Sequence, residues 1–122
     1  MYEDSIHLLE MPEHDSISVC AFIEKEDLFA VGERIQAKFE PAYMNGYNWE
    51  AIIKFYLSQV DPELLSQIGM DPEAGMFSAY TSYSDENLAK MKKLRGHLLE
   101  LVGDEPALMQ LIADNVDKIE WD

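Results

Sequence analysis

The sequence has one cysteine, nine basic residues, three histidines and no apolar run long enough to span a membrane. A lone Cys20 cannot form an intramolecular disulfide, and its place in a run of β-forming residues favours a small buried side chain over a nucleophile. A reducing compartment is therefore expected. The opening segment 1–5 lacks the basic and apolar regions of a secretory signal, so we expect a cytoplasmic protein with no membrane contact.

The sequence also lacks the motifs of common catalytic and metal-binding sites. His7, His14 and His97 fall on a predicted strand, turn and helix without the spacing of zinc ligands. There is no Gly-x-Ser-x-Gly motif, no phosphate-binding glycine loop and no calcium-loop spacing. We therefore predict no catalytic residue, metal or cofactor. Acid–base chemistry by a pair such as Asp71 and Glu73 stays open, but a chain with 24 acidic residues offers many such pairs.

The most distinctive feature of the composition is an excess of acidic residues. Acidic residues outnumber basic ones by 24 to 9, which gives a formal net charge of −15 at pH 7. Such a chain repels nucleic acids and anionic membranes, so neither is an expected partner. A basic protein would be attracted, because complementary charge in one patch accelerates association by about 10- to 1000-fold. Solubility alone is the alternative explanation of the charge.

The chain of 122 residues, with 48% apolar and 11% aromatic residues, is predicted to form one domain over residues 1–122. Apolar-rich runs predict strands at 6–11, 16–24 and 76–83. Helical spacing predicts helices at 26–39, 49–60, 85–102 and 104–115, with a short helical turn at 62–68. The expected fold class is α+β: a mostly antiparallel sheet, made of the N-terminal hairpin plus a central strand, with helices packed on one face.

Capping residues predict the helix boundaries. Asp27, Asn48 and Ser84 are expected to cap three of the helices, because their short side chains accept hydrogen bonds from unpaired backbone N–H groups. Gly103 is expected to end the long helix. The tail 118–122 is expected to be a short final strand or a frayed end.

The irregular segment 40–48 is unusually rich in aromatic residues for a loop. Tyrosine, tryptophan and methionine on an irregular segment are typical of binding hot spots. The alternative is that these side chains plug a helix into the sheet. This alternative is favoured for Trp49, which begins an apolar stripe, whereas Tyr43 and Tyr47 stay open between packing and binding.

Three runs carry recognisable motifs: YMNGYNWE at 43–50, DPEAGMF at 71–77 and IEW at 119–121. Together they resemble the bacterial polymorphic-toxin immunity proteins of the group called immunity protein 51. The resemblance covers the chain from about Phe39 onward, and the N-terminal hairpin carries no comparable motif. None of the three runs is a catalytic signature, so the resemblance depends on their combination.

The resemblance implies a cytoplasmic protein, encoded beside a toxin, that binds the toxin domain and blocks it in the producing cell. Many toxins of such systems are nucleases with basic clefts. An acidic, non-covalent interface would compete there with nucleic acid. Two alternatives stay open: an acidic adaptor or regulatory protein for a basic host protein, and a small enzyme that uses carboxylates. The sequence does not determine the oligomeric state.

The shared motif residues are not expected to be the toxin contacts, because positions that define a family usually define its fold. The resemblance therefore implies a structural role for Gly46, Trp49, Gly75 and Trp121. Toxin contacts are expected from exposed acids and aromatic rings on loops and helix starts. These candidates are Tyr43, Tyr47, Asp71, Glu73, Asp85 and Glu86.

Overall fold

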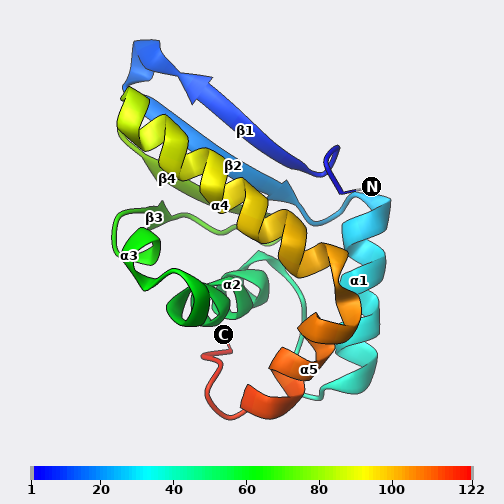
Figure 1. Cartoon of the computed structure of the whole chain (residues 1–122). Coiled ribbons are helices and arrows are strands. Elements are labelled where there is room, and N and C mark those ends of the chain that lie inside the picture. The colour runs from blue at the N-terminus through cyan, green and yellow to red at the C-terminus, as the bar shows by residue number, and fades with distance from the viewer. Residues whose placement is uncertain (1, 122) are drawn as a thin grey trace.

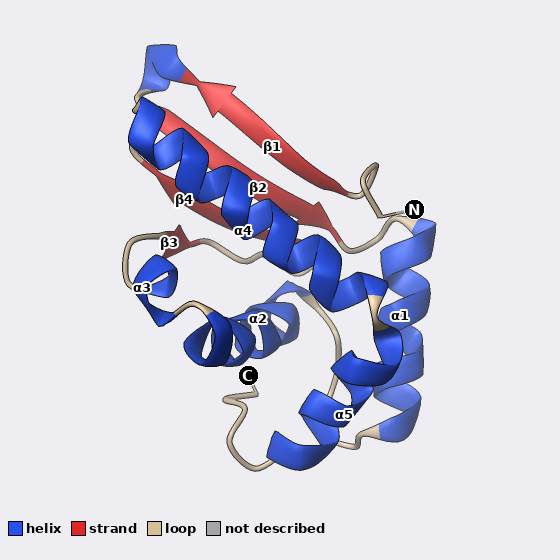
Figure 2. Cartoon of the chain, in the orientation of Figure 1, coloured by secondary structure: helices blue, strands red, loops and turns tan. Residues whose placement is uncertain are grey.

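The computed structural model describes residues 2–121 (Figures 1 and 2). Within that range the strands are β1 (Ile6–Met11), β2 (Ser16–Phe22), β3 (Gly69–Met70) and β4 (Met76–Thr81). The helices are α1 (Glu26–Lys38), α2 (Gly46–Val60), α3 (Pro62–Leu65), α4 (Asp85–Gly103) and α5 (Glu105–Asn115), with a 3-10 helix η1 (Pro12–His14). The strands form one antiparallel sheet in the order β1-β2-β4-β3, so the predicted α+β class is confirmed.

The sheet has one buried face and one open face. Along β2, Val19 lies between Leu8 of β1 and Ala79 of β4, and this face is buried. The alternate residues point to the opposite face, where Leu9 and Tyr80 are exposed. This two-residue alternation is expected of an antiparallel sheet that helices cover on one side only.

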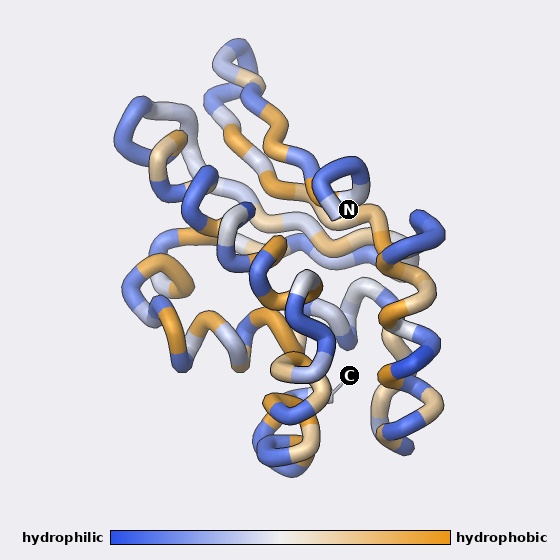
Figure 3. The backbone as a smooth tube through the Cα atoms, turned by 45° about the vertical axis from the view of Figure 1, so that its right-hand side comes forward, coloured by the Kyte–Doolittle hydropathy of each residue, from blue (hydrophilic) through white to orange (hydrophobic). Residues whose placement is uncertain are grey.

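The helices pack on the buried face. Helix α4 lies across β1 and β2, and α2 packs against β4 (Figure 1). Apolar and polar stretches alternate along the longer helices (Figure 3), so these helices present an apolar stripe inward. In α4 this stripe includes Met91, Leu94 and Leu98, which are almost fully buried. Burial of each stabilises the fold by about 1.5–3 kcal/mol relative to an exposed side chain.

Helix boundaries agree with the predictions in part. Ser84 caps α4 as expected, since its Oγ accepts a hydrogen bond from the N–H of Asn87 at 3.0 Å. The prediction that Asp27 caps the first helix was wrong, because α1 already begins at Glu26, with Lys25 as its N-cap. The Asp27 carboxylate instead accepts a hydrogen bond from the hydroxyl of Ser5, which ties α1 to the start of the hairpin.

The end of α4 also differs from the prediction. Gly103 is the last residue of α4 and does not cap it, because Asp104 holds the C-cap position. The same Asp104 is the N-cap of α5, where its carboxylate accepts from the N–H of Ala107 at 3.3 Å. One residue therefore ends one helix and begins the next.

Strand β3 and the C-terminal tail also differ from the predictions. Strand β3 pairs Gly69 with Tyr80, and a Cβ at Gly69 would lie 2.5 Å from the Tyr80 ring. The C-terminal tail is not a strand within its described residues, and it is not frayed. Ile119 is buried there, and the indole N–H of Trp121 donates to the carbonyl of Val116 at 3.0 Å. Trp121 thus has a structural role, as the resemblance implied.

Candidate functional site

The loop between α1 and α2 is organised by two asparagines. Asn45 caps α2, accepting from the N–H of Asn48 at 2.9 Å, so the helix begins at Gly46. The prediction that Asn48 caps this helix was therefore wrong. Its side-chain oxygen instead accepts hydrogen bonds from the backbone N–H groups of Tyr43 and Met44. Asn48 is only 2% exposed, so it anchors the loop from inside the protein.

Within this loop Met44 has a left-handed backbone, with φ of 57°. A non-glycine residue in this region costs about 1–2 kcal/mol, and the two hydrogen bonds to Asn48 hold it there. The side chains on either side of this turn differ sharply in burial: Met44 is 8% exposed and Tyr43 is 72% exposed. The loop therefore holds one side chain in the core and presents the other to solvent.

The hairpin between β3 and β4 is held against the start of α2. The N–H of Gly46 donates to the carbonyl of Ala74 at 3.0 Å. A Cβ at Gly46 would lie 1.8 Å from the carbonyl oxygen of Glu73, so only glycine permits this close approach. The structural role implied for Gly46 is thus explained by backbone contact.

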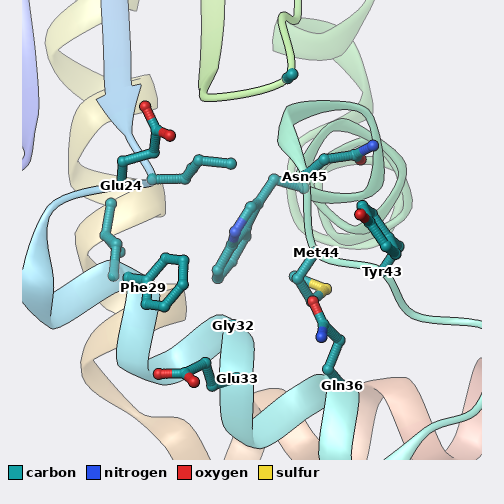
Figure 4. Close-up of a pocket in the computed structure, with 12 residues that line it drawn as sticks. Glu24, Phe29, Gly32, Glu33, Gln36, Tyr43, Met44 and Asn45 are labelled. Atoms are coloured by element: carbon teal, nitrogen blue, oxygen red, sulfur yellow. The ribbon is translucent and has the colours of Figure 1, made fainter.

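A cleft of about 380 Å³ opens where these segments meet the start of α1 (Figure 4). One wall comes from the end of β2 and from α1, and the other from the loop and the tip of the hairpin. The lining residues are Ile23, Glu24, Leu28, Phe29, Gly32, Glu33, Gln36, Tyr43, Met44, Asn45, Trp49 and Ala74. Trp49 is 3% exposed and belongs to the core, as its apolar stripe predicted.

The cleft combines aromatic rings with carboxylates. In Figure 4, Phe29 and Tyr43 lie on opposite sides, and Glu24 and Glu33 lie at separate ends. Phe29 is 52% exposed, an unusual position for a large apolar ring. Within residues 2–121, the carboxylate of neither glutamate makes a hydrogen bond or ion pair, and no lining residue is Lys, Arg or His. The cleft therefore suits a ligand with an apolar body and a positive charge.

The structure brings some of the predicted toxin contacts to this end of the molecule. Tyr43 lines the cleft, and Glu73 is exposed beside Ala74 at the hairpin tip. Asp71 is exposed on the same hairpin, where its N–H donates to the carbonyl of Ser78. Tyr47 lies in the first turn of α2 and is 40% exposed, but it does not line the cleft.

The other two predicted contacts lie elsewhere. Asp85 and Glu86 form the first turn of α4, which follows the far end of β4 from the hairpin tip. Glu86 makes an ion pair with Lys90 one turn later, at 3.4 Å. The six candidates therefore do not form one surface, because β4 separates the two groups.

Of the lining residues, sequence reasoning had named only Tyr43 as a toxin contact, and it did not identify the exposed ring of Phe29 or the carboxylates of Glu24 and Glu33. Phe29 lies beside the apolar stripe of α1, on a helix face that is otherwise exposed and polar. An isolated aromatic ring on the polar side of an amphipathic helix was the available signal. The two glutamates gave none, since the chain has many exposed acids.

Away from the cleft, Asp61 links α2 and α3 to α4. Its carboxylate contacts the Lys93 ammonium at 3.0 Å and His97 Nε2 at 3.1 Å. Hydrogen bonds from Lys93 and then His97 lower the pKa of Asp61 below its ordinary value of 3.8. Cys20 is buried as predicted, and burial raises the pKa of its thiol.

Among residues 2–121, no group of three or more His, Cys, Asp or Glu side chains is arranged to hold a metal ion. No helix in that part of the chain combines the length and apolar character needed to cross a membrane.

A family model described as Immunity protein 51 matches residues 8–116. Searches of curated proteins and of solved structures found no match. The matched range includes most of the N-terminal hairpin, for which the sequence offered no motif, and the whole cleft. It ends before the IEW run at 119–121.

Proposed function

The chain belongs to the immunity protein 51 family, and we propose that it neutralises a cognate bacterial toxin by binding the toxin domain non-covalently. The proposed inhibitor has no catalytic activity of its own and acts in the cytoplasm of the producing cell, before the toxin reaches its substrate. The toxin is proposed to be a basic nuclease. An acidic interface would cover its phosphate-binding surface and exclude nucleic acid.

The observation that carries this proposal is the cleft beside Tyr43. Large aromatic rings exposed beside unpaired carboxylates are the composition of a protein-binding hot spot with a charged rim. Tyr43 is 72% exposed, so its ring contributes little to the folded core. The net charge of −15 adds long-range attraction toward a basic partner.

The first test is co-expression of this chain with the protein encoded immediately upstream of its gene. Survival of the host together with co-purification of the two proteins supports an immunity function. If the chain folds but neither protects the host nor forms a complex, the adaptor alternative takes precedence. A steep loss of affinity with rising salt would support a basic toxin, since screening weakens exposed charge pairs.

Tyr43→Ala tests whether the exposed ring is an anchor. We expect the dissociation constant to rise by more than about five-fold, which corresponds to about 1 kcal/mol, with an unchanged melting temperature. Val60→Ala is the matched control, because Val60 is 48% exposed at the other end of α2. Equal affinity of the two variants would show that Tyr43 is not an anchor. A large fall in melting temperature for Tyr43→Ala would show that its ring stabilises the fold.

A pair of double variants decides which end of β4 faces the toxin. Asp71→Asn with Glu73→Gln removes two charges near the cleft, and Asp85→Asn with Glu86→Gln removes the same charge from the start of α4. We expect the hairpin variant to lose more affinity, because it lies on the side of Tyr43. The opposite order would place the interface at the start of α4. Thermal unfolding of each variant controls for lost helix stability, since acids in a first turn stabilise a helix by about 0.3–1 kcal/mol.

A further inference from the structure

We propose that the cleft between α1 and the 43–45 loop receives an arginine side chain of the toxin. This inference rests on the proposed function and specifies the chemistry that the cleft recognises. The volume of about 380 Å³ accommodates one long side chain with part of its backbone, so the contact is an insertion and not a flat surface.

Among residues 2–121, neither carboxylate of the cleft makes an ion pair, and the charge of Glu33 acts on its neighbour Arg34 without a direct contact. Glu24 follows β2 and Glu33 lies on α1, so the two ends of the cleft each carry one negative charge (Figure 4). Arg34, the neighbour of Glu33, is turned to α5, where its Nε and Nη2 each donate to the carboxylate of Glu105 at 2.7 Å. Lys25, the neighbour of Glu24, is exposed and is not among the lining residues. A cation must therefore come from a partner.

The walls of the cleft select the shape of that cation. Phe29 and Tyr43 are exposed on opposite sides, and the ring of Trp49 forms part of the lining. A guanidinium is planar and weakly hydrated, so it stacks on an aromatic face while its edges donate to carboxylates. A lysine ammonium is strongly hydrated and cannot stack, and it should therefore bind less tightly.

Other occupants fit the cleft less well. An anion would be repelled by both glutamates. An uncharged apolar group would remove water from Glu24 and Glu33 without providing a partner, and an unpaired buried carboxylate is costly. An arginine supplies the charge, the donors and an apolar stem together.

The arginine preference can be measured without the toxin. N-acetyl-arginine amide is titrated into the ¹⁵N-labelled protein, with the citrulline analogue as an uncharged control of similar shape and the lysine analogue as a cation that cannot stack. We expect saturable shifts of the Gly32 and Asn45 amides and the Trp49 indole N–H with arginine, weaker shifts with lysine, and none with citrulline. Equal shifts with citrulline, or no shift at these sites with arginine, would overturn the inference.

Two double variants, each of which removes two negative charges, compare the cleft with the rest of the surface. The variant Glu24→Gln with Glu33→Gln should abolish the arginine shifts. The control Glu13→Gln with Glu63→Gln changes the net charge equally at exposed positions on η1 and α3 and should preserve them. An equal loss in both variants would show a general effect of net charge and would count against the cleft.

With the toxin in hand, the cleft variant should raise the dissociation constant by about 10-fold or more, and the control by about 3-fold at most. Replacing one particular toxin arginine should lower the affinity when Glu24 and Glu33 are present and should have little further effect in the cleft variant. If the toxin binds wild type and both variants equally, the inference is wrong and the proposed function stands. If the folded wild type binds no toxin at all, the proposed function fails and the inference fails with it.

Discussion

Replacement of Gly46 by alanine should destabilise the protein by detaching the hairpin tip from α2. The added Cβ would lie 1.8 Å from the carbonyl oxygen of Glu73 and 2.4 Å from that of Met76. Both oxygens belong to backbone, and they are held in place by mutual hydrogen bonds, Glu73 N–H to Met76 O at 2.7 Å and Met76 N–H to Glu73 O at 3.4 Å. The clash therefore cannot be relieved by rotating a side chain.

The size of the effect follows from two opposing contributions. Overpacking typically costs about 1–3 kcal/mol and occasionally more, and the cost lies at or above the upper end where rigid backbone must move. Alanine recovers at most about 1 kcal/mol of helix propensity, and less in the first turn. We expect a net loss of about 2–3 kcal/mol in the free energy of unfolding. For a chain of this length, that corresponds to a melting temperature lower by about 8–12 °C.

The matched control is Gly96→Ala in α4. Gly96 is exposed in the middle of that helix, and an added Cβ there meets nothing within 4 Å. This variant should stabilise the protein by about 0.5–1 kcal/mol through helix propensity alone. Urea unfolding of both variants, with the slope compared to wild type, measures the two changes on one scale.

The reasoning would be refuted if Gly46→Ala unfolds at the wild-type urea concentration while Gly96→Ala shows its expected gain. That pair of results would mean that the hairpin tip does not rest firmly on α2. A Gly46→Ala loss accompanied by weaker binding of the arginine probe would show that the same contact also shapes the cleft.

Three further predictions concern single residues. Asn48→Ala leaves the buried N–H of Met44 without its acceptor, so it should cost about 1–3 kcal/mol in thermal unfolding. Asp61 has a lowered pKa in the fold, so its stabilisation should be complete above its ordinary pKa of 3.8 and disappear as the pH falls through the lower folded value. Urea midpoints measured between about pH 5 and 2 should therefore fall less in Asp61→Asn than in the wild-type protein. Cys20 is buried with a raised pKa, so a thiol reagent should label it only as fast as the protein opens, and rapid labelling in native buffer would contradict this.

Local patterns in the sequence identified most of the elements. The hairpin, α4 with its Ser84 cap and the buried position of Trp49 all follow from spacing of apolar residues and from one capping side chain. These features depend on contacts between residues close in the chain, or on which face of an element is apolar. A single sequence contains that information.

The start of α2 shows where local reasoning fails. Asn45 and Asn48 are both good capping residues, and sequence alone favoured the second because it directly precedes Trp49. Asn45 caps the helix in the structure, because the side-chain oxygen of Asn48 accepts hydrogen bonds from the N–H groups of Tyr43 and Met44 instead. Strand β3 was missed for a similar reason, since two residues have no periodicity and pair only because β4 is already in the sheet.

The sequence by itself determined the α+β class, the large negative charge and the family motifs, because composition and periodicity are properties of the chain. Only the tertiary structure decided that Glu24, Phe29 and Glu33 share a cleft with Tyr43 and that Asp85 and Glu86 lie at the other end of β4. The cleft exists because α1, the loop and the hairpin tip converge through backbone contacts at Gly46 and the Asn48 hydrogen bonds. Contacts between such distant segments depend on how the whole chain packs, and no local pattern encodes them.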